Sequence, residues 1–238
     1  MKKTIYLLSV CVLLFSCKVS ETTKKENIDQ KAFQKSDYAK ETNPIASWLI
    51  DFEPTATVII GPEREYKSLF EYFSQNPEVS NVYVLVEEGT YYSDNDVWVY
   101  GNNIVVEGIG NVHHYCNQLY ASVLDIFGTN IMIKNLHLQH TQPGDPEHQN
   151  CSGRVIMFDN AHNCIIDACD LNGCGLAGLH DNMGNSDILI RNCYIHNNSL
   201  GAYTDIEGGV WQEAIKDHPV FQFENNKIKN NGPDRVPE

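Results

Sequence analysis

A nine-residue phrase recurs four times in the second half of the chain. It reads N-I-M-I-K-N-L-H-L from Asn130, N-C-I-I-D-A-C-D-L from Asn163, D-I-L-I-R-N-C-Y-I from Asp187 and V-F-Q-F-E-N-N-K-I from Val220. A shorter relative, N-I-V-V-E-G-I, begins at Asn103. The starts lie 27, 33, 24 and 33 residues apart, as expected for a 24-residue unit with insertions in its loops. A β-type repeat with this period predicts a solenoid.

Positions within the phrase predict which side chains point inward. The first and third positions after the start are apolar, and the positions between them are mixed. Because side chains alternate along a strand, the first and third positions share one face, which is predicted to point inward. The inward set is Ile131, Ile133, Cys164, Ile166, Ile188, Ile190, Phe221 and Phe223. The eighth position is also apolar and belongs to a second strand. The fifth position holds Asn135, Ala168, Asn192 and Asn225, and an asparagine at such a bend is expected to bind backbone groups of neighbouring coils.

Inward aliphatic stacks with asparagine at one corner resemble the right-handed parallel β-helix of the pectin-lyase-like superfamily. The resemblance covers Tyr66 to Gly232, including a short amphipathic helix at Tyr66–Phe73 and the strand and turn at Val82–Tyr92. It implies an all-β fold, a parallel β-helix solenoid of about five coils with a short N-terminal capping helix. The fold does not specify an activity, because one fold hosts many functions.

The N-terminus has the features of a secretory signal. Met1-Lys2-Lys3 is followed by an apolar run from Ile5 to Phe15 and then by Ser16-Cys17. This pattern resembles bacterial lipoproteins and implies that Cys17 is lipidated; a plain secretory signal or an uncleaved anchor is the alternative. We therefore expect a signal peptide over residues 1–17, a disordered tether over 18–43 and a β-helix domain over 44–238. The predicted location is the bacterial cell envelope, facing either side of the outer membrane.

The formal net charge of −14 limits the partners of the chain. Such a charge disfavours nucleic acid and anionic lipid headgroups, so the expected membrane contact is the lipid on Cys17 alone. A polysaccharide is the candidate soluble ligand. Polyuronates would be repelled unless a divalent cation bridged the two. The oligomeric state is not specified by the sequence.

Five of the six cysteines outside the signal region fall into two groups. Cys164, Cys169 and Cys193 occupy repeat positions and are predicted to be stacked core thiols, because buried cysteine behaves as a small hydrophobic residue. Cys116 and Cys151 lie outside the phrase and are the better candidates for a disulfide.

Aspartates mark one further set of strands. In the family that the chain resembles, the ligand groove lies on the strand that follows the second strand of each repeat. Here these strands are expected at Val123–Ile126, Val155–Asp159, Gly178–Asp181 and Ala202–Asp205, and they carry Asp125, Asp159, Asp181 and Asp205. Asp181 and Asp205 are 24 residues apart and should stack at the strand spacing of about 4.8 Å.

Stacked carboxylates suit either of two roles. They form an acid–base pair, or they hold a cation such as Ca²⁺. The candidate metal ligands are Asp159, Asp181 and Asp205, and the candidate catalytic residues are Asp181 and Asp205 with His180 or Arg154 as proton acceptor. The alternative is local turn chemistry, in which each aspartate caps its own backbone.

A second candidate metal site lies in the loop His140–Cys151. It contains His140 and His148 with nearby acids, so it could bind zinc or another transition metal, although zinc is less favoured than calcium and a polar surface loop is the alternative. Trp98 and Tyr100 alternate along one strand and are positioned to stack on sugars or to pack beneath the N-terminal segment.

Two functions follow from these features. The first is an envelope-anchored, non-catalytic binding or scaffolding lipoprotein for a carbohydrate or a protein. The second is a polysaccharide lyase or glycoside hydrolase with an acidic groove, with or without calcium. The chain lacks the G-H-G and R-x-K motifs of polygalacturonase-like hydrolases, and nothing around Arg154 matches a pectate lyase. We therefore favour the non-catalytic function.

Overall fold

The structure is a computed structural model that describes residues 28–141, 152–173 and 175–234. The chain divides into two compact units, residues 1–31 and 32–238. Only the last few residues of the first unit are described, so the account below concerns the second. Within the described ranges no helix is long and apolar enough to span a membrane.

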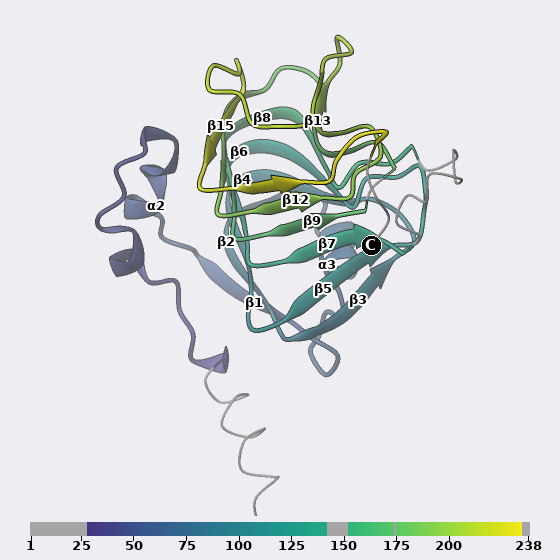
Figure 1. The fold of residues 1–238 in the computed structure, drawn as a ribbon. Coiled ribbons are helices and arrows are strands. Elements are labelled where there is room, and N and C mark those ends of the chain that lie inside the picture. Colours follow the sequence, from purple (N-terminus) through teal and green to yellow (C-terminus); the bar gives the residue numbers. More distant parts are fainter. Residues whose placement is uncertain (1–27, 142–151, 174, 235–238) are drawn as a thin grey trace, which may run out of the picture. The chain divides into compact units, whose positions relative to one another are not determined.

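The second unit is a parallel β-solenoid with three faces, which confirms the predicted fold (Figure 1). Face 1 consists of the first halves of β4 (Val97–Gly108), β6 (Leu124–Lys134) and β8 (Ile156–Asp167), with β10 (Ala177–Asp181), β13 (Gly201–Asp205) and β14 (Val210–Trp211). Face 2 consists of β1 (Ala56–Ile60), β2 (Val79–Val86), the second halves of β4, β6 and β8, β11 (Ser186–Arg191) and β15 (Phe221–Glu224). Face 3 consists of β3 (Gly89–Ser93), β5 (Val112–Cys116), β7 (His137–His140), β9 (Asp170–Asn172), β12 (Tyr194–His196) and β16 (Lys227–Lys229).

Each coil runs from face 1 through face 2 to face 3. Strands of successive coils pair in parallel, and among the described strands only β14 pairs antiparallel, with β13. In β4 and β6 the chain bends between faces 1 and 2 at glycines with positive φ, Gly101 (141°) and Gly128 (130°). In β8 the bend contains one extra residue, which shifts the register between β6 and β8 after Ile126.

The predicted inward positions form the core. Ile131, Ile133, Cys164, Ile166 and Ile188 are all fully buried, and the last coil is the exception because Phe223 is only partly buried. Burying one such aliphatic side chain contributes about 1.5–3 kcal/mol. The thiols of Cys169 and Cys193 are also buried, as predicted, and burial raises the pKa of Cys164 to about 12. Cys116 is buried in β5, whereas Cys151 lies outside the described residues.

The corner between faces 2 and 3 explains the recurring asparagine. Asn135, Ala168, Asn192 and Asn225 all have a left-handed backbone, with φ between 54° and 56°. Asparagine tolerates this conformation better than most residues. Asn135 Nδ2 donates to the backbone oxygen Gly108 O at 2.7 Å, which confirms the predicted bond to a neighbouring coil. Asn192 Nδ2 instead donates to a side chain of the neighbouring coil, Asp167 Oδ1, at 2.9 Å.

A short helix covers the N-terminal end of the core. Helix α3 (Leu69–Gln75) begins after Ser68, whose hydroxyl accepts a hydrogen bond from Glu71 N. This is an N-cap, which satisfies one of the free N–H groups of the first turn. Leu69, Tyr72 and Phe73 are buried against the first coil, so the capping helix lies close to its predicted place.

The N-terminal segment Ala32–Phe52, here named the strap, differs from the expected tether. It contains η1 (Lys35–Tyr38), η2 (Pro44–Ala46) and α2 (Trp48–Asp51) and packs on the outer surface of face 2. Phe33 stacks edge-on against Tyr83, and Tyr38 Oη donates to Met132 Sδ at 3.7 Å. The outward residues beneath the strap share an apolar character and are almost completely buried: Tyr83, Val105, Met132, Ile165 and Leu189. The strap is ordered because it covers this apolar row; residues 18–27 lie outside the described ranges.

The C-terminal end of the core is covered by the loop between β13 and β15. Trp211 in β14 stacks on Tyr203 of the last face 1 strand, with ring centroids 5.0 Å apart. Tyr203 Oη donates to Glu213 O at 3.0 Å and accepts from Ile215 N at 3.2 Å. His218 accepts hydrogen bonds through Nδ1 from Val220 N and Phe221 N. These contacts form a C-terminal cap that the repeat pattern alone does not predict.

A candidate ligand-binding site on face 1

The outer surface of face 1 carries one row of side chains in register. Trp98 pairs with Asp125, Asp125 with Met157, Met157 with His180, and His180 with Thr204. These residues occupy outward positions because Leu124, Ile126, Ile156 and Leu179 beside them are buried inward. The four strands expected from the sequence therefore form one face and present one continuous row.

Asp125 lies at the centre of this site in an unusual environment for a carboxyl group. Only 8% of the residue is exposed, and its Oδ1 has no hydrogen-bond partner. Burial raises its pKa to about 7, and the neighbouring Asp96 carboxylate raises it further, while Ser122 and Arg154 oppose the shift. Asp96 Oδ1 is also buried and unpartnered. With its pKa raised to about 7, the Asp125 carboxyl group is largely protonated below pH 7.

Arg154 and His180 complete the polar part of the site. The positive charge of Arg154 opposes the rise in the pKa of Asp125 and contributes to the lowered pKa of His180. The Nε atom of Arg154 is buried and has no hydrogen-bond partner. Burial and then Arg154 lower the pKa of His180 to about 4. His180 is therefore neutral at physiological pH, and its Nδ1 lies 2.8 Å from Thr204 Oγ1. Of the two proton acceptors proposed from the sequence, Arg154 is unsuited to the role, because an arginine remains protonated and donates hydrogen bonds.

Exposed aromatic side chains border the polar row. Trp98 is 64% exposed, and Tyr100 and Phe127 contact each other edge-to-face with centroids 5.0 Å apart. Tyr100 and Phe127 are neighbours in register on β4 and β6. Trp98 thus extends from face 1 next to Asp125 and does not pack beneath the N-terminal segment.

Asp181 and Asp205 are aligned in register, as the 24-residue spacing predicts. Each, however, binds a group of its own turn. Asp181 Oδ1 accepts from Asn185 Nδ2 at 2.5 Å, and Asp205 Oδ1 accepts from Gly209 N at 2.7 Å. This is the local turn chemistry that the sequence left as the alternative, and it occupies one oxygen of each carboxylate.

Asp159 does not belong to the same stack. The register places Phe158, and not Asp159, opposite Asp181. The Asp159 carboxylate instead accepts hydrogen bonds from Asn160 Nδ2 at 2.8 Å and Asn182 Nδ2 at 3.0 Å. Asp159 is therefore offset by one residue from Asp181, within the one or two residues that the repeat spacing leaves open, and both of its oxygens accept hydrogen bonds.

His140 is held away from these aspartates. It is completely buried at the end of β7, and its Nε2 lies 2.8 Å from Ala121 O. Within the described ranges no three His, Cys, Asp or Glu side chains converge closely enough to hold a metal ion. Asp159, Asp181, Asp205 and His140 therefore do not form the expected calcium or zinc site by themselves, and His148 lies outside the described residues.

Asp96 is the member of the site that sequence reasoning missed. It precedes Trp98 by two residues in the segment D-N-D-V-W-V-Y, one coil before Asp125. No aspartate recurs at the matching place in the other coils, so the repeat itself does not point to it. The sequence did show an acid next to a strand with outward aromatic residues. Its place beside Asp125 becomes evident only when the strand register is known.

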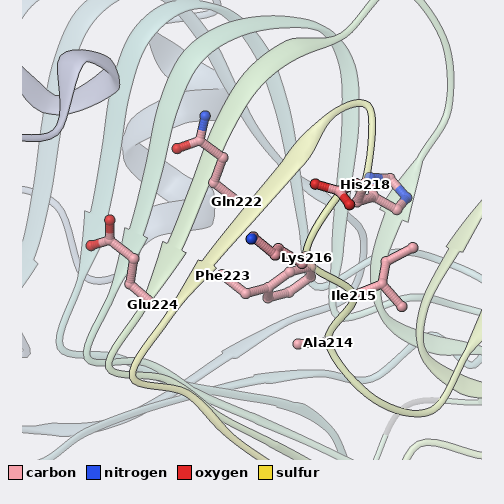
Figure 2. Close-up of a pocket in the computed structure, with 8 residues that line it drawn as sticks. Ala214, Ile215, Lys216, His218, Gln222, Phe223 and Glu224 are labelled. Atoms are coloured by element: carbon pink, nitrogen blue, oxygen red, sulfur yellow. The ribbon is translucent and has the colours of Figure 1, made fainter.

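A hollow with a volume of about 650 Å³ lies at the last coil, away from the face 1 row (Figure 2). It is lined by Ala214–His218 on one side and Gln222–Glu224 of β15 on the other. Asn43 of the strap already donates to Glu224 Oε1 at 2.8 Å and contacts Gln222 Oε1 at 3.5 Å. The polar groups on the strand side of this hollow are thus engaged, and face 1 is the stronger candidate.

No protein-family model and no curated protein sequence matches the chain. A similar solved structure is the pectin methylesterase from Aspergillus niger. The alignment covers 76% of this chain and 87% of that chain, with 10% sequence identity and a TM-score of 0.34.

Proposed function

We propose that the protein is a non-catalytic carbohydrate-binding protein that holds a glycan on the outer surface of face 1. The supporting observation is the 64% exposed Trp98 in register beside the buried carboxyl group of Asp125, whose Oδ1 has no hydrogen-bond partner. An aromatic face packs against the C–H groups of a sugar ring, and nearby polar groups fix its hydroxyls. Asp96, Asp125, Arg154 and His180 supply both donors and acceptors for those hydroxyls.

The charge of face 1 favours a glycan without anionic groups. Asp96, Asp159, Asp181 and Asp205 lie along this face, whereas Arg154 is the one cation within the site described above. An anionic polymer would meet these carboxylates unless their charge was balanced. We therefore expect neutral polysaccharides to bind face 1 more tightly than acidic ones.

Affinity gel electrophoresis with a panel of neutral polysaccharides tests this function. Trp98→Ala should weaken the interaction with the retained polymer about tenfold, which corresponds to about 1.4 kcal/mol. Ile50→Ala is the matched control, because it removes an exposed apolar side chain from the strap. Retention that is equal in the wild type and in Trp98→Ala would contradict the proposed site.

Hydrolysis of the bound glycan is a second candidate function. It is favoured by Asp125, because a carboxyl group whose pKa is raised to about 7 can donate a proton at neutral pH, as a general acid must. Against it, the chain lacks the G-H-G and R-x-K motifs of polygalacturonase-like hydrolases. Release of reducing ends by the wild type that Asp125→Asn abolishes, with binding retained, would establish catalysis.

The anchor at Cys17 is proposed from the sequence alone. The basic start, the short apolar run and the L-F-S-C end support processing as an envelope lipoprotein. Metabolic labelling with an alkyne fatty acid should mark the wild type and not Cys17→Ser. Labelling of both proteins, or of neither, would remove the anchor from the proposal without affecting the glycan site.

A further inference from the structure

Two cysteines of successive coils, Cys169 and Cys193, lie side by side at the corner between faces 2 and 3. They are named the corner pair here. Cys169 directly precedes β9 and Cys193 directly precedes β12, which are neighbouring strands (Figure 1). The backbone fixes this alignment, because Tyr194 N donates to Cys169 O at 2.9 Å. The paired residues on either side have the same 24-residue offset: Asp167 with Arg191, and Asp170 with Tyr194.

The side chains of the corner pair point into the same part of the core. Each cysteine is 2% exposed and belongs to the hydrophobic core. The Cys193 Sγ atom reaches back toward the preceding coil, where it lies 3.5 Å from Ile166 O. The Cys169 Sγ atom lies 3.4 Å from Asp167 O, the next carbonyl oxygen along that coil. Both sulfur atoms therefore lie beside the same short stretch of backbone.

The spacing of the two coils suits a covalent link between the sulfur atoms. Neighbouring strands of a sheet lie about 4.8 Å apart. The Cα atoms of two cysteines that are joined by a disulfide lie about 4.4–6.8 Å apart. The backbone of the corner pair is therefore already at a distance from which a disulfide can form.

The other described cysteines have different neighbours on the adjacent coils. The register places Ile188 beside Cys164. It places Ser93 and His140 beside Cys116. Among the cysteines of the described ranges, only the corner pair therefore consists of two cysteines in register on successive coils.

We propose that the corner pair is an oxidation site at which a disulfide joins two successive coils. The oxidant is a low-molecular-weight disulfide of the glutathione type. The thiolate of one cysteine attacks a sulfur atom of this oxidant, which forms a mixed disulfide and releases one reduced thiol. The thiolate of the other cysteine attacks the mixed disulfide and releases the second reduced thiol. The corner pair thus loses two protons and two electrons, and the oxidant takes up both.

This exchange takes place before the coils are packed. Burial raises the pKa of the Cys169 thiol well above its usual value, and a thiol that is buried and protonated reacts slowly. Each coil of a solenoid contacts mainly its neighbours, so one part of a solenoid can be open while another part is folded. The corner pair is accessible to the oxidant while the later coils are open, and packing of these coils then protects the disulfide.

Refolding of the full chain from urea in a mixture of oxidised and reduced glutathione tests the proposal. After alkylation of free thiols, trypsin without a reductant places the cysteines of the corner pair on different peptides, residues 155–191 and 192–216. Mass spectrometry should find these peptides linked, lighter than their sum by two hydrogen atoms, with fragmentation locating the link at Cys169. The linked protein should unfold about 5–10 °C above protein refolded with dithiothreitol.

Two matched variants and two contrary outcomes complete the test. Cys164→Ser removes another buried thiol of the same tryptic peptide and should keep the link, whereas Cys193→Ser should abolish it. Recovery of both cysteines as alkylated thiols from folded wild type would overturn the proposal, and so would a link from Cys193 to a different cysteine. Both outcomes are read from the wild type, so they do not depend on the folding of a variant. The corner pair shares no residue with face 1, so its failure is distinguishable from failure of the glycan site.

Discussion

Glu41 and Arg191 lie 150 residues apart in the chain and form an ion pair, with 2.6 Å between Glu41 Oε2 and Arg191 Nη1. Arg191 Nε also donates to Asp167 Oδ2 at 3.0 Å. The three side chains are each about one-tenth exposed. The strap is thus fixed to face 2 by a charge network as well as by the apolar row beneath it.

We predict that Glu41→Gln weakens this attachment. Burial alone would raise the pKa of Glu41, but the hydrogen bond from Arg191 and the bonds from Asn43 and Thr42 lower it below its usual value. The stability that a depressed carboxyl pKa contributes is present above the unfolded-state pKa and is lost as pH falls through the folded-state value. At pH 7, Glu41→Gln should lower the free energy of unfolding, measured with urea, by about 2 kcal/mol. At pH 3 the same substitution should change this free energy little. Lys35→Gln, which removes an exposed ion pair with Glu53, should change little.

Asp125→Asn should make the protein more stable at neutral pH. The pKa of Asp125 is raised from 3.8 to about 7. A raised pKa contributes stability below the unfolded-state value, and that contribution is lost as pH rises through the folded-state value. The difference in the free energy of unfolding between Asp125→Asn and the wild type should therefore rise by about 1.4 kcal/mol per pH unit between pH 4 and 7. The total gain in stability of the variant over this range is about 4 kcal/mol. A constant difference between pH 4 and 8 would contradict this account, and the exposed Asp234→Asn serves as control.

Ala168→Asn should stabilise the solenoid. Ala168 is exposed and has φ 54°, the left-handed conformation that its counterparts adopt with asparagine. This conformation costs an ordinary residue about 1–2 kcal/mol, and asparagine should recover about 1 kcal/mol. The reverse change, Asn192→Ala, loses the tolerance of asparagine for the left-handed conformation and also the hydrogen bond to Asp167. It should lower the free energy of unfolding by about 1–2 kcal/mol. Thermal unfolding of both variants measures the effect, and shifts of the same sign would disprove the explanation.

Gly128→Ala should be far more damaging than Gly208→Ala. A Cβ atom at Gly128 would lie 1.9 Å from Gly101 O, on top of the strain of φ +130°. At Gly208, φ is +90° but no atom lies within 4 Å of the added carbon. We expect Gly208→Ala to lower the free energy of unfolding by about 1–2 kcal/mol. Gly128→Ala should lower it by at least about 3 kcal/mol or prevent folding altogether. Equal losses would show that steric contact between coils does not limit the bend.

The inward side chains of the solenoid could be predicted because the same positions recur in every coil. Ile133, Ile166 and Ile190 repeat at fixed places, and strand alternation assigns them to the interior. The strap could not be predicted this way, since Met132, Ile165 and Leu189 point outward and belong to a face that alternation assigns to solvent. Their apolar character was the available sign, because a continuous apolar run marks a strand that is buried on both sides.

The candidate site was predicted less completely than the fold. The row of groove strands and the alignment of Asp181 with Asp205 follow from the spacing of the repeat. The pairing of Asp96 with Asp125 depends on how the first coil aligns with the second, and the turn bonds of Asp181 and Asp205 depend on local loop geometry. These relationships arise from side chains that do not recur, so a repeat pattern contains no information about them.

The strap relates the length of one segment to the number of coils. Going from Phe33 to Asn43, it meets β2, β6, β11 and β15 in turn, ending at Glu224. Ten residues reach at most about 36 Å, and each coil advances by about 4.8 Å. Duplicating or deleting a coil would shift Arg191 and Glu224 relative to Glu41 and Asn43 and break both attachments. Solenoids commonly grow or shrink by whole repeats during evolution, but in this protein such a change would have to be matched by a change in the length of the strap.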